Sequence, residues 1–347
     1  MPEISPDSEM AALIAQLRAD NVVRGDRVSV EPLTGGVSSE IVRVRDGERD
    51  FVVKRALAKL RVAEDWYADT NRNLFERQYI EYVQDVMPEA VPAIMHAGDG
   101  YFVMEHLGAG FVNWKQKLLQ GKLDVADARR AGHTLAVIHR TSAGRDEVAR
   151  RFDTTCNFKA LRVDPYLLTT AKRHSKLRGI IEAEAERLAT TRLALVHGDY
   201  SPKNIMVSSA RLVVLDCEVA WYGDPAFDLA FLLNHLFLKT LLERANRAGL
   251  RQMIDTARGA YFETLGDALD AKAMDARTAR LLLMLMLARI DGKSPVEYLT
   301  IDATRQFVRR FVTEALLEGD DWTLDAVAAL WFTKVEKEHG PDANRNR

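Results

Sequence analysis

The sequence predicts an α+β fold in two lobes, with a small N-terminal antiparallel β lobe and a larger, mainly helical C-terminal lobe. Three observations lead to this expectation: β-rich runs joined by short turns at 28–57, two further strand-like runs at 91–107, and helical periodicity over most of the remaining chain. We expect the two lobes to span 1–104 and 111–347, with a glycine-containing hinge at 105–110.

The expected elements of the small lobe follow from turn signals and apolar spacing. A short amphipathic helix is predicted at 6–19. A Gly-Gly loop and the turn signal Asp46-Gly47 divide 28–57 into a three-stranded antiparallel meander. Apolar side chains recur at helical spacing through 70–87, which indicates a second helix in this lobe.

The large lobe is expected to be built mostly from helices. Helical patterns cover 125–141, 172–189 and most of 225–340, whereas the clear strands are short and flank 195–216. The most apolar run, 280–290, is too short to span a bilayer. We therefore expect this run to be a buried helix.

The composition excludes several classes of protein. Of 347 residues, 47% are hydrophobic, and the net charge of −2 lacks the basic excess of a general nucleic-acid binder. Two cysteines, Cys156 and Cys217, are too few for a disulfide framework and form no metal-ligand cluster in sequence. The polar N-terminal stretch does not resemble a signal peptide. We expect a cytoplasmic monomer or homodimer with no nucleic-acid or membrane partner.

The most informative stretch is "LVHGDYSPKNIMV", in which Asp199 and Asn204 lie in a short loop between two apolar runs. A second apolar run ends at Asp216, and Glu218 follows it. A hairpin of such strands would bring these oxygen-bearing side chains together, and oxygen ligands suit Mg²⁺. The aspartate could orient a hydroxyl nucleophile and accept its proton. Each residue alone is more often an ordinary loop residue, so the prediction depends on the joint pattern.

This segment resembles the aminoglycoside phosphotransferase-like small-molecule kinases, which share the fold of the eukaryotic protein kinases. The catalytic loop of that family has the form His-Gly-Asp-x4-Asn, matched here by His197, Gly198, Asp199 and Asn204. The resemblance implies that ATP is the phosphoryl donor and that Asp199 is the catalytic base. It also implies that Asn204 and Asp216 bind Mg²⁺, with Glu218 as a further candidate ligand.

A second motif, "GDPAFDLA", also matches the family. Asp224 is expected to cap a helix whose first residue is Pro225. In such kinases the second aspartate of the motif, here Asp228, is mainly structural and supports the catalytic loop. The segment "LAVIHR" matches a helix of the family, and we expect its His139 to be a structural core histidine.

The N-terminal half contains counterparts of the nucleotide-binding elements of such kinases. In "LTGGVSSE", Gly35, Gly36 and Ser38 offer backbone N–H groups and a hydroxyl to phosphates, although a Gly-Gly pair alone is more often a turn. The segment "FVMEHL" matches the hinge strand. There the resemblance implies that backbone groups of Glu105 and Leu107 pair with the adenine edge.

Lys54 in "FVVKR" matches the third-strand lysine that pairs with phosphates in these kinases. An otherwise apolar strand does not normally carry a charge unless the charge meets a partner, although a solvent-facing strand end is the alternative. The partner should be a glutamate on the following helix. We expect Glu76, with Glu81 as the second candidate.

The acceptor is expected to be a small molecule with a hydroxyl group, such as a sugar, polyol, amino alcohol or aminoglycoside-like compound. Protein kinases usually carry a lysine where this chain has Ser201, and the short interval between Asp216 and Gly223 leaves no room for an activation loop. The Asp-x-Glu at Asp216–Glu218 is similar to that of methylthioribose and choline kinases. Methylthioribose kinases typically depart from asparagine at the position of Asn204, so methylthioribose itself is not assigned.

The candidate acceptor residues lie at the end of the predicted buried helix and near the catalytic strands. Arg289 and Asp291 adjoin an otherwise apolar run and could line a pocket, or they could only mark the end of the helix. The pair Arg309-Arg310 resembles an arginine pair of the methylthioribose kinases. Trp221 could stack on a ring, but an aromatic residue near a strand end more often belongs to the core.

Two other functions remain open from the sequence. One is a catalytically inert nucleotide-binding protein that keeps the fold. The four polar residues of the motifs are all present, which argues against an inert protein: Lys54, Asp199, Asn204 and Asp216. The other is a protein kinase, which the missing activation segment disfavours.

Overall fold

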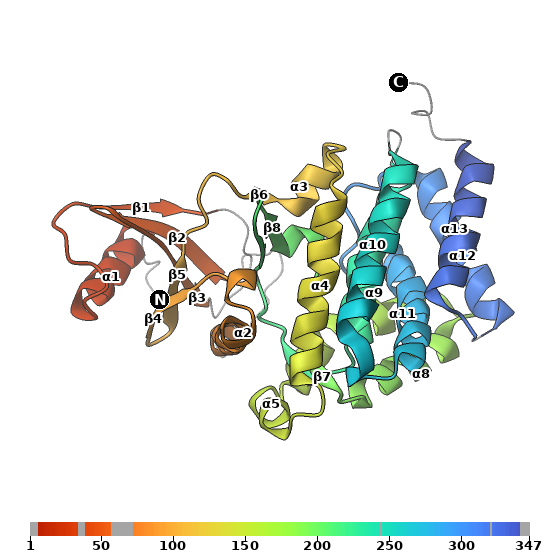
Figure 1. Cartoon of the computed structure of the whole chain (residues 1–347), viewed down its shortest axis with the longest axis horizontal. Coiled ribbons are helices and arrows are strands. Elements are labelled where there is room, and N and C mark those ends of the chain that lie inside the picture. Colours follow the sequence, from red (N-terminus) through yellow and green to blue (C-terminus); the bar gives the residue numbers. More distant parts are fainter. Residues whose placement is uncertain (1–5, 34–38, 57–71, 243–244, 320, 341–347) are drawn as a thin grey trace.

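The computed structural model describes residues 6–33, 39–56, 72–242, 245–319 and 321–340. A small lobe built around a sheet adjoins a larger lobe of mostly upright helices (Figure 1). The predicted class, α+β with a small antiparallel β lobe followed by a larger helical lobe, is confirmed.

The sheet of the small lobe has five antiparallel strands in the order β1-β2-β3-β5-β4. The predicted meander is present, and Gly47, with φ of +63°, makes the turn between its second and third strands. The strands are β1 (Val28–Pro32), β2 (Ser39–Asp46), β3 (Arg49–Ala56), β4 (Ile94–Gly98) and β5 (Tyr101–Glu105).

Two helices, α1 (Pro6–Ala19) and α2 (Arg72–Val86), pack against opposite faces of this sheet. Side chains alternate between the faces of a strand, so Phe51 and Val53 of β3 pack with α1. Val52 packs with α2 and with buried residues of the large lobe. Lys54, two residues further along β3, therefore faces α2 as well.

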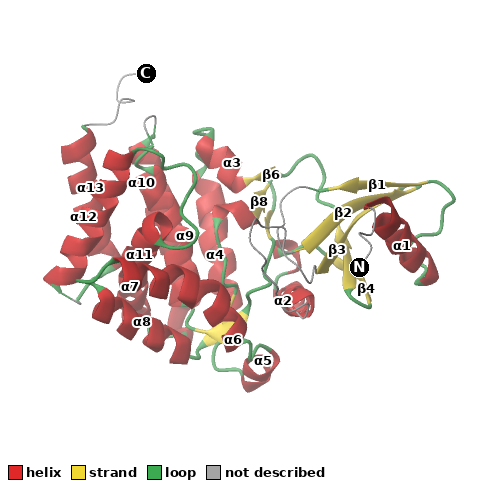
Figure 2. Cartoon of the chain, turned by 180° about the vertical axis from the view of Figure 1, so that it is seen from behind, coloured by secondary structure: helices red, strands yellow, loops and turns green. Residues whose placement is uncertain are grey.

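The large lobe is a bundle in which α9 is buried along its whole length and α11 along most of it (Figure 2). No helix in the described ranges is long and apolar enough to cross a membrane. The helices are α3 (Trp114–Leu119), α4 (Val125–Ser142), α5 (Asp146–Arg151), α6 (Thr155–Phe158), α7 (Thr169–Arg173), α8 (Arg178–Thr190), α9 (Ala226–Lys239), α10 (Arg247–Leu265), α11 (Ala271–Asp291), α12 (Asp302–Glu318) and α13 (Leu324–His339).

Short strands form the platform between the lobes. The predicted strands around 195–216 are present, but two more of these short strands, β6 and β10, were not expected. The strands are β6 (Val112–Asn113), β8 (Ile205–Val207) and β9 (Leu212–Val214) in one sheet, and β7 (Ala194–Val196) paired with β10 (Trp221–Gly223) in another.

The single helix predicted at 172–189 is wrong. The chain instead leaves the helical conformation at His174, whose ψ is 80°, and starts α8 at Arg178. The ring of His174 lies 2.8 Å from the carboxylate of Asp291, so a distant contact accompanies the break. A π-helical segment, η2 (Lys159–Leu168), precedes α7 and has no counterpart in the sequence-based prediction.

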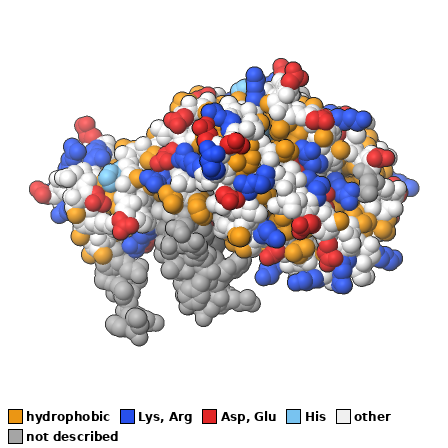
Figure 3. Space-filling model, turned by 90° about the horizontal axis from the view of Figure 1, so that it is seen from below, with side chains coloured by type: hydrophobic (Ala, Val, Ile, Leu, Met, Phe, Trp, Pro, Cys, Tyr) orange, Lys and Arg blue, Asp and Glu red, His pale blue; other side chains and the backbone are white. Residues whose placement is uncertain are grey.

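The lobes share one apolar cluster, in which Val52 and Tyr79 of the small lobe pack with Ile138, Leu195 and Tyr222 of the large lobe. This cluster lies between the sheet and the short strands, so it holds α2 against those strands. Acidic and basic side chains are interspersed over the face of both lobes seen in Figure 3, in keeping with the net charge of −2.

Candidate active site

The loop between β7 and β8 is held in one conformation by Asp228 and Gly198. Gly198 has φ of +78°, and a Cβ there would lie 2.7 Å from the carbonyl oxygen of Val219, so this position requires glycine. The buried carboxylate of Asp228 accepts the backbone N–H groups of His197 at 2.6 Å and of Gly198 at 2.9 Å. Asp228 therefore contacts the loop in the way that the family resemblance implies.

His197 is a buried, neutral histidine that supports the loop. Its Nδ1 accepts the backbone N–H of Asp199 at 3.1 Å, so its Nε2 carries the proton and faces the carbonyl oxygen of Leu215 at 3.2 Å. Burial lowers the pKa of His197, although nearby carboxylates oppose that shift. The ring thereby connects the loop to the strand that precedes Asp216.

Asp199 presents a carboxylate with one unused oxygen. Its Oδ2 lies 3.1 Å from Arg162 and 2.9 Å from Lys203, whereas Oδ1 is buried without a hydrogen-bond partner among the described residues. Burial disfavours the charge, but Lys203 and Arg162 outweigh it and lower the pKa of Asp199. The group is therefore ionised and can accept a hydrogen bond from an incoming hydroxyl.

Asn204 lies within this loop, and the structure places Asp216 beside it. The side-chain amide of Asn204 donates a hydrogen bond to the backbone carbonyl oxygen of Asp199 at 3.0 Å. The backbone carbonyl oxygen of Asn204 accepts the N–H of Leu215 at 2.8 Å. Asp216 follows directly, with φ of +60°. Burial would raise the pKa of Asp216, but Lys54 outweighs this effect and lowers it to about 2.

The chemistry of these side chains fits a magnesium ion, which they would hold through oxygen atoms. Asn204, Asp216 and the half-buried Glu218 offer hard oxygen donors on one platform. Across the described ranges no group of three or more His, Cys, Asp or Glu side chains is placed to hold a metal ion by itself. An incomplete set of oxygen ligands suits Mg²⁺, because this ion takes much of its coordination from water and phosphate oxygens.

Lys54 forms an ion pair with Glu76, and both side chains are 3% exposed. Its Nζ lies 2.7 Å from Glu76 on α2 and 3.1 Å from Asp216. Burial disfavours the charge of Lys54, but Glu76 and Asp216 outweigh it and raise the pKa of the amine. Glu81, the second candidate, instead pairs with Arg151 at 2.8 Å.

At the predicted hinge, Glu105 is the last residue of β5 and Leu107 follows it. The backbone N–H of Glu105 donates to the carbonyl oxygen of Ala93 at 2.9 Å, so a contact from Glu105 to adenine would have to use its carbonyl oxygen. Sequence reasoning missed Arg211, which lies between β8 and β9 and pairs with the Glu105 carboxylate at 2.8 Å. Arg211 thereby fastens the large lobe to the hinge strand.

Arg211 and Arg162 gave no signal in the sequence, because each contacts a partner that is remote along the chain. Lys203 lies inside the loop motif and could have been noticed as a basic residue four positions from Asp199. The predicted phosphate-loop residues Gly35, Gly36 and Ser38 lie outside the described residues.

Two of the three candidate acceptor residues are placed where they serve the fold. Trp221 is fully buried and stacks on Phe158 with ring centroids 4.1 Å apart, so it offers no ring face to a substrate. Asp291 is held by both nitrogens of Arg309, at 2.6 and 2.8 Å, and by His174. The expectation that these two residues line a pocket is therefore corrected.

The pair Arg309-Arg310 also forms ion pairs within the fold. Arg309 pairs with Asp291, and Arg310 pairs with Glu338. Arg289 remains a candidate. It is buried, with Nη1 donating to the hydroxyl of Tyr166 at 3.1 Å and to that of Ser294 at 3.1 Å.

The second motif serves mainly to hold the lobe together. The helix begins at Ala226, one residue later than predicted, although Asp224 still accepts the N–H of Ala226 at 3.0 Å. Asp224 also pairs with Arg187 at 2.6 Å, an ion pair that the sequence did not indicate. His139 is fully buried, with Nδ1 2.8 Å from the hydroxyl of Tyr261, as expected of a core histidine.

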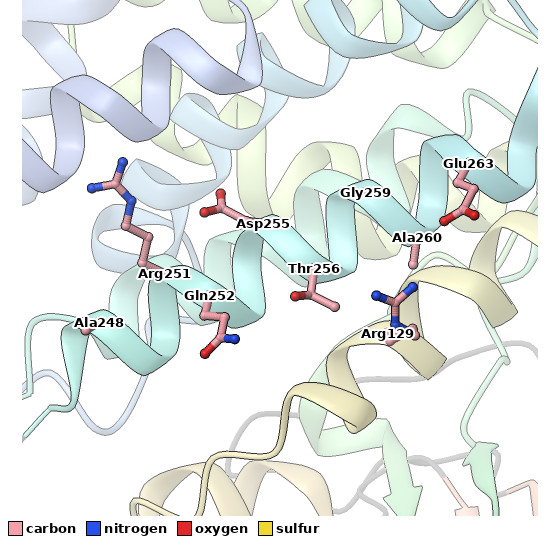
Figure 4. Close-up of a pocket in the computed structure, with 9 residues that line it drawn as sticks. All are labelled: Arg129, Ala248, Arg251, Gln252, Asp255, Thr256, Gly259, Ala260 and Glu263. Atoms are coloured by element: carbon pink, nitrogen blue, oxygen red, sulfur yellow. The ribbon is translucent and has the colours of Figure 1, made fainter.

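A surface hollow lies elsewhere, along one side of α10 with Arg129 of α4 at its edge (Figure 4). Arg251, Asp255 and Glu263 give it charges of both signs. It contains no residue of the catalytic loop. The chemistry described above is therefore concentrated between the lobes, not in this hollow.

The two-lobed fold and the site between the lobes define a protein of the kinase-like class. Residues 29–269 match the phosphotransferase enzyme family, named APH. This match spans more than half of the chain. The chain therefore belongs to the phosphotransferase enzyme family.

The chain is similar to a methylthioribose kinase of Exiguobacterium sibiricum, with 26% identity over 65% of this chain and 64% of that protein. A methylthioribose kinase of Bacillus cereus is 22% identical over 60% of both chains. The matches thus span about three fifths of the length of these curated relatives.

Two solved structures share the fold. A choline/ethanolamine kinase family protein from Mesorhizobium loti has a TM-score of 0.52 and 18% identity, and the match covers 94% of this chain and 99% of that chain. Amicoumacin kinase hAmiN, in complex with AMP-PNP, Ca²⁺ and its ligand Ami, has a TM-score of 0.55 and 13% identity, covering 89% and 94%.

Proposed function

We propose that this protein is an ATP- and Mg²⁺-dependent phosphotransferase that transfers the γ-phosphate to a hydroxyl group of a small molecule. The observation that carries the proposal is the arrangement around Asp199. An ionised, buried carboxylate with one unused oxygen lies beside Asn204 and Asp216, and Asp216 pairs with Lys54. Relatives named as methylthioribose kinases support the same reaction class.

The roles proposed for the residues follow from their positions. The unused oxygen of Asp199 would accept the hydrogen bond of the acceptor hydroxyl and then its proton, while the hydroxyl oxygen bonds to the γ-phosphorus and the bond to ADP breaks. Lys54, oriented by Glu76, would pair with phosphate oxygens. Asn204 and Asp216, with Glu218 as a further ligand, would hold Mg²⁺, which neutralises charge on the phosphates.

The remaining nucleotide contacts are proposals from the family resemblance. Gly35, Gly36 and Ser38 would cover the phosphates, and the backbone of Glu105 and Leu107 would receive the adenine ring. Amicoumacin kinase hAmiN, which shares this fold, is a complex with AMP-PNP, and this supports nucleotide binding by the present protein. Movement about the hinge proposed at 105–110 would admit nucleotide and exclude water.

The test is ADP release from Mg²⁺-ATP by wild-type protein and Asp199→Asn, with and without a panel of hydroxylated acceptors. Asparagine keeps the shape but cannot accept the proton, so we expect turnover to fall by about 10²–10⁴-fold. Binding of AMP-PNP should change by less than about threefold, because Asp199 acts on the acceptor. The matched control is Asp153→Asn, an exposed aspartate whose carboxylate pairs with Arg192.

The two readouts separate the proposal from its alternative. Turnover that Asp199→Asn abolishes and Asp153→Asn retains would support the kinase. Nucleotide binding without turnover, with water or any acceptor, would favour an inert nucleotide-binding protein. Full activity of Asp199→Asn would overturn the assignment of the base.

A further inference from the structure

A group of basic side chains lies next to the catalytic loop in the large lobe. We call it the basic cluster. The positive charges of all its other members act on the imidazole of His235, near the C-terminal end of α9. The members come from separate elements: Lys115 of α3, Lys203 of the catalytic loop, His235 and Lys239 of α9, and Arg289 of α11.

A continuous chain of contacts joins the basic cluster to Asp199. The guanidinium of Arg162 is 3.1 Å from the Asp199 carboxylate and lies over the ring of Tyr166, 5.9 Å from its centroid. The hydroxyl of Tyr166 accepts a hydrogen bond from Arg289 at 3.1 Å. Lys203 pairs directly with Asp199 at 2.9 Å. The cluster therefore adjoins the carboxylate that would receive the acceptor hydroxyl.

Aromatic rings line the same region. The ring of Phe231 lies 5.7 Å from that of Tyr166 and 5.5 Å from that of His235. The Nδ1 atom of His235 is 3.3 Å from the hydroxyl of Tyr298. These contacts connect the catalytic side of the cluster to its far end, where Lys239 lies.

The amine of Lys239 is buried and contacts neutral groups. Its side chain is 1% exposed, and its Nζ contacts the carbonyl oxygen of His235 at 3.3 Å and the ring of Tyr298 at 4.4 Å. Within the described ranges it forms no ion pair with a carboxylate. Glu297, the acidic residue near it, forms an ion pair with Lys115 instead.

Arg289 is likewise buried, and one of its nitrogens lacks a hydrogen-bond partner among the described residues. It is 8% exposed, its Nη1 donates to Tyr166 and Ser294, and its Nε is buried with no hydrogen-bond partner among the described residues. Burial of unpaired charge is costly, and proteins keep it where a ligand or a reaction uses it. Among the described residues neither Lys239 nor Arg289 forms an ion pair with a carboxylate, and Arg289 is linked to Asp199 through Tyr166 and Arg162.

The pKa of Lys239 agrees with this geometry. Burial lowers it to about 7, the positive charges of Lys115 and Arg289 act in the same direction, and Glu297 opposes them. An anion bound beside the amine would reverse this shift and restore its charge. A negative group beside the amine would therefore stabilise its charged form.

We propose that the acceptor of this phosphotransferase is an anionic hydroxylated small molecule, whose carboxylate or phosphate group binds Lys239 and Arg289 while its hydroxyl meets Asp199. This inference rests on the proposed function and narrows its acceptor class. In the transfer, the hydroxyl oxygen bonds to the γ-phosphorus, the phosphorus–oxygen bond to ADP breaks, and the hydroxyl proton passes to Asp199. The anionic group does not react and only positions the acceptor.

The test compares acceptors that differ only in charge. ADP release is measured with glycerate against glycerol, gluconate against sorbitol, and ribose 5-phosphate against ribose, with choline as a cationic acceptor. We expect at least one anion to exceed its neutral partner by tenfold or more in kcat/KM. In Lys239→Met and Arg289→Met this preference should disappear through a rise in KM, because both residues bind the anion and neither contacts the reacting atoms.

The control variant is Arg310→Met, which removes an exposed arginine paired with Glu338 and should keep the preference. Binding provides a second readout. Calorimetric titration of glycerate or ribose 5-phosphate into protein with AMP-PNP and Mg²⁺ at pH 8 should show proton uptake, because the anion raises the pKa of Lys239. Lys239→Met should abolish the uptake. The charged and titratable groups that face this amine are His235, Lys115, Arg289, Glu297 and Tyr298.

The outcomes distinguish the inference from the proposed function. Hydrolysis of ATP with water alone, lost in Asp199→Asn, reports the kinase chemistry. If that activity is present but neutral or choline acceptors are preferred, or both cluster variants keep the anion preference, the inference is overturned and the kinase stands. If no ADP forms at all, the proposed function fails. In that case, an absence of anion binding to the wild-type protein overturns the inference as well.

Discussion

At the scale of single residues, Lys54 is a buried charge to which we assign a role in the proposed reaction as well as in folding. It is fully surrounded by the lobes and paired with Glu76 and Asp216. Removing one partner of a buried ion pair is costly because the other charge remains buried, whereas replacing both with apolar groups can be nearly neutral.

We therefore predict that Lys54→Met lowers the melting temperature and reduces kcat by about 10²-fold or more, because a charge that stabilises the transferred phosphate is lost. The double variant Lys54→Met/Glu76→Leu should recover much of the stability without recovering turnover. Differential scanning calorimetry and ADP release check the two parts. Recovery of activity in the double variant would show that Lys54 has only a structural role.

At the scale of elements, the loop between β7 and β8 depends on a backbone conformation that only glycine adopts easily. Gly198 has φ of +78°, and its neighbour Val219 leaves no space for a Cβ. Gly144, at the turn after α4, has a similar φ of +67°, but a Cβ added there would have no atom of the described residues within 4 Å. An alanine at Gly144 would therefore cause backbone strain alone, whereas an alanine at Gly198 would add a steric clash.

We predict that Gly144→Ala costs about 1 kcal/mol of unfolding free energy, the usual cost of the left-handed conformation, and leaves kcat unchanged. Gly198→Ala should cost more and should also lower kcat, because the clash with Val219 displaces Asp199. Urea denaturation and steady-state kinetics measure the two effects. Equal effects of the two substitutions on stability and turnover would contradict this account.

Helix α9 carries a second testable consequence, because Lys239 is buried in it with a pKa of about 7 instead of the ordinary lysine value of 10.5. A base whose folded pKa lies below its unfolded pKa destabilises the fold most at low pH. This penalty is complete below pH 7 and disappears as the pH rises toward 10.5. The unfolding free energy of the wild-type protein should therefore rise with pH relative to that of Lys239→Met.

Between pH 7 and pH 9 we expect this difference to change by about 2 kcal/mol, by proton linkage. The measurement is chemical denaturation of both proteins in buffers free of phosphate, sulfate and carboxylates. A bound anion would mask the effect by restoring the charge of Lys239. A difference that does not depend on pH would mean that Lys239 keeps its proton in the folded state.

At the scale of the whole molecule, the lobes are connected by a shared apolar cluster and by polar contacts on either side of the site. Lys54 of the small lobe reaches Asp216 at 3.1 Å, and Arg211 of the large lobe reaches Glu105 at 2.8 Å. A nucleotide with its metal would bind to groups from both lobes. Its binding energy should therefore stabilise the molecule as a unit.

We predict that AMP-PNP with Mg²⁺ at one hundred times its Kd adds about 2.7 kcal/mol of stability and raises the melting temperature by about 4 °C. Removal of the metal with EDTA should eliminate most of this shift. In Asp216→Asn the shift should no longer depend on Mg²⁺. An equal shift with and without Mg²⁺ in the wild-type protein would contradict the metal assignment.

The sequence by itself determined the features that depend on local order along the chain. Alternation in β3 placed Lys54 on the face opposite Phe51, and the helical stripe of α2 that contains Tyr79 and Val83 also contains Glu76. The short spacing between Asp199 and Asn204 fixed both groups within one loop. Periodicity and turn signals therefore predicted the two lobes and brought the main candidate residues together.

Only the tertiary structure decided which distant residues meet. Local pattern shows that a side chain is buried but not against what, so Trp221 could be a ring for a substrate until Phe158 was found stacked on it. The same reason explains why Asp291 pairs with Arg309 and why Arg162 reaches Asp199. The surroundings of Lys239 are also a tertiary property, because only the positions of its neighbours in space show that none of the described carboxylates pairs with its amine.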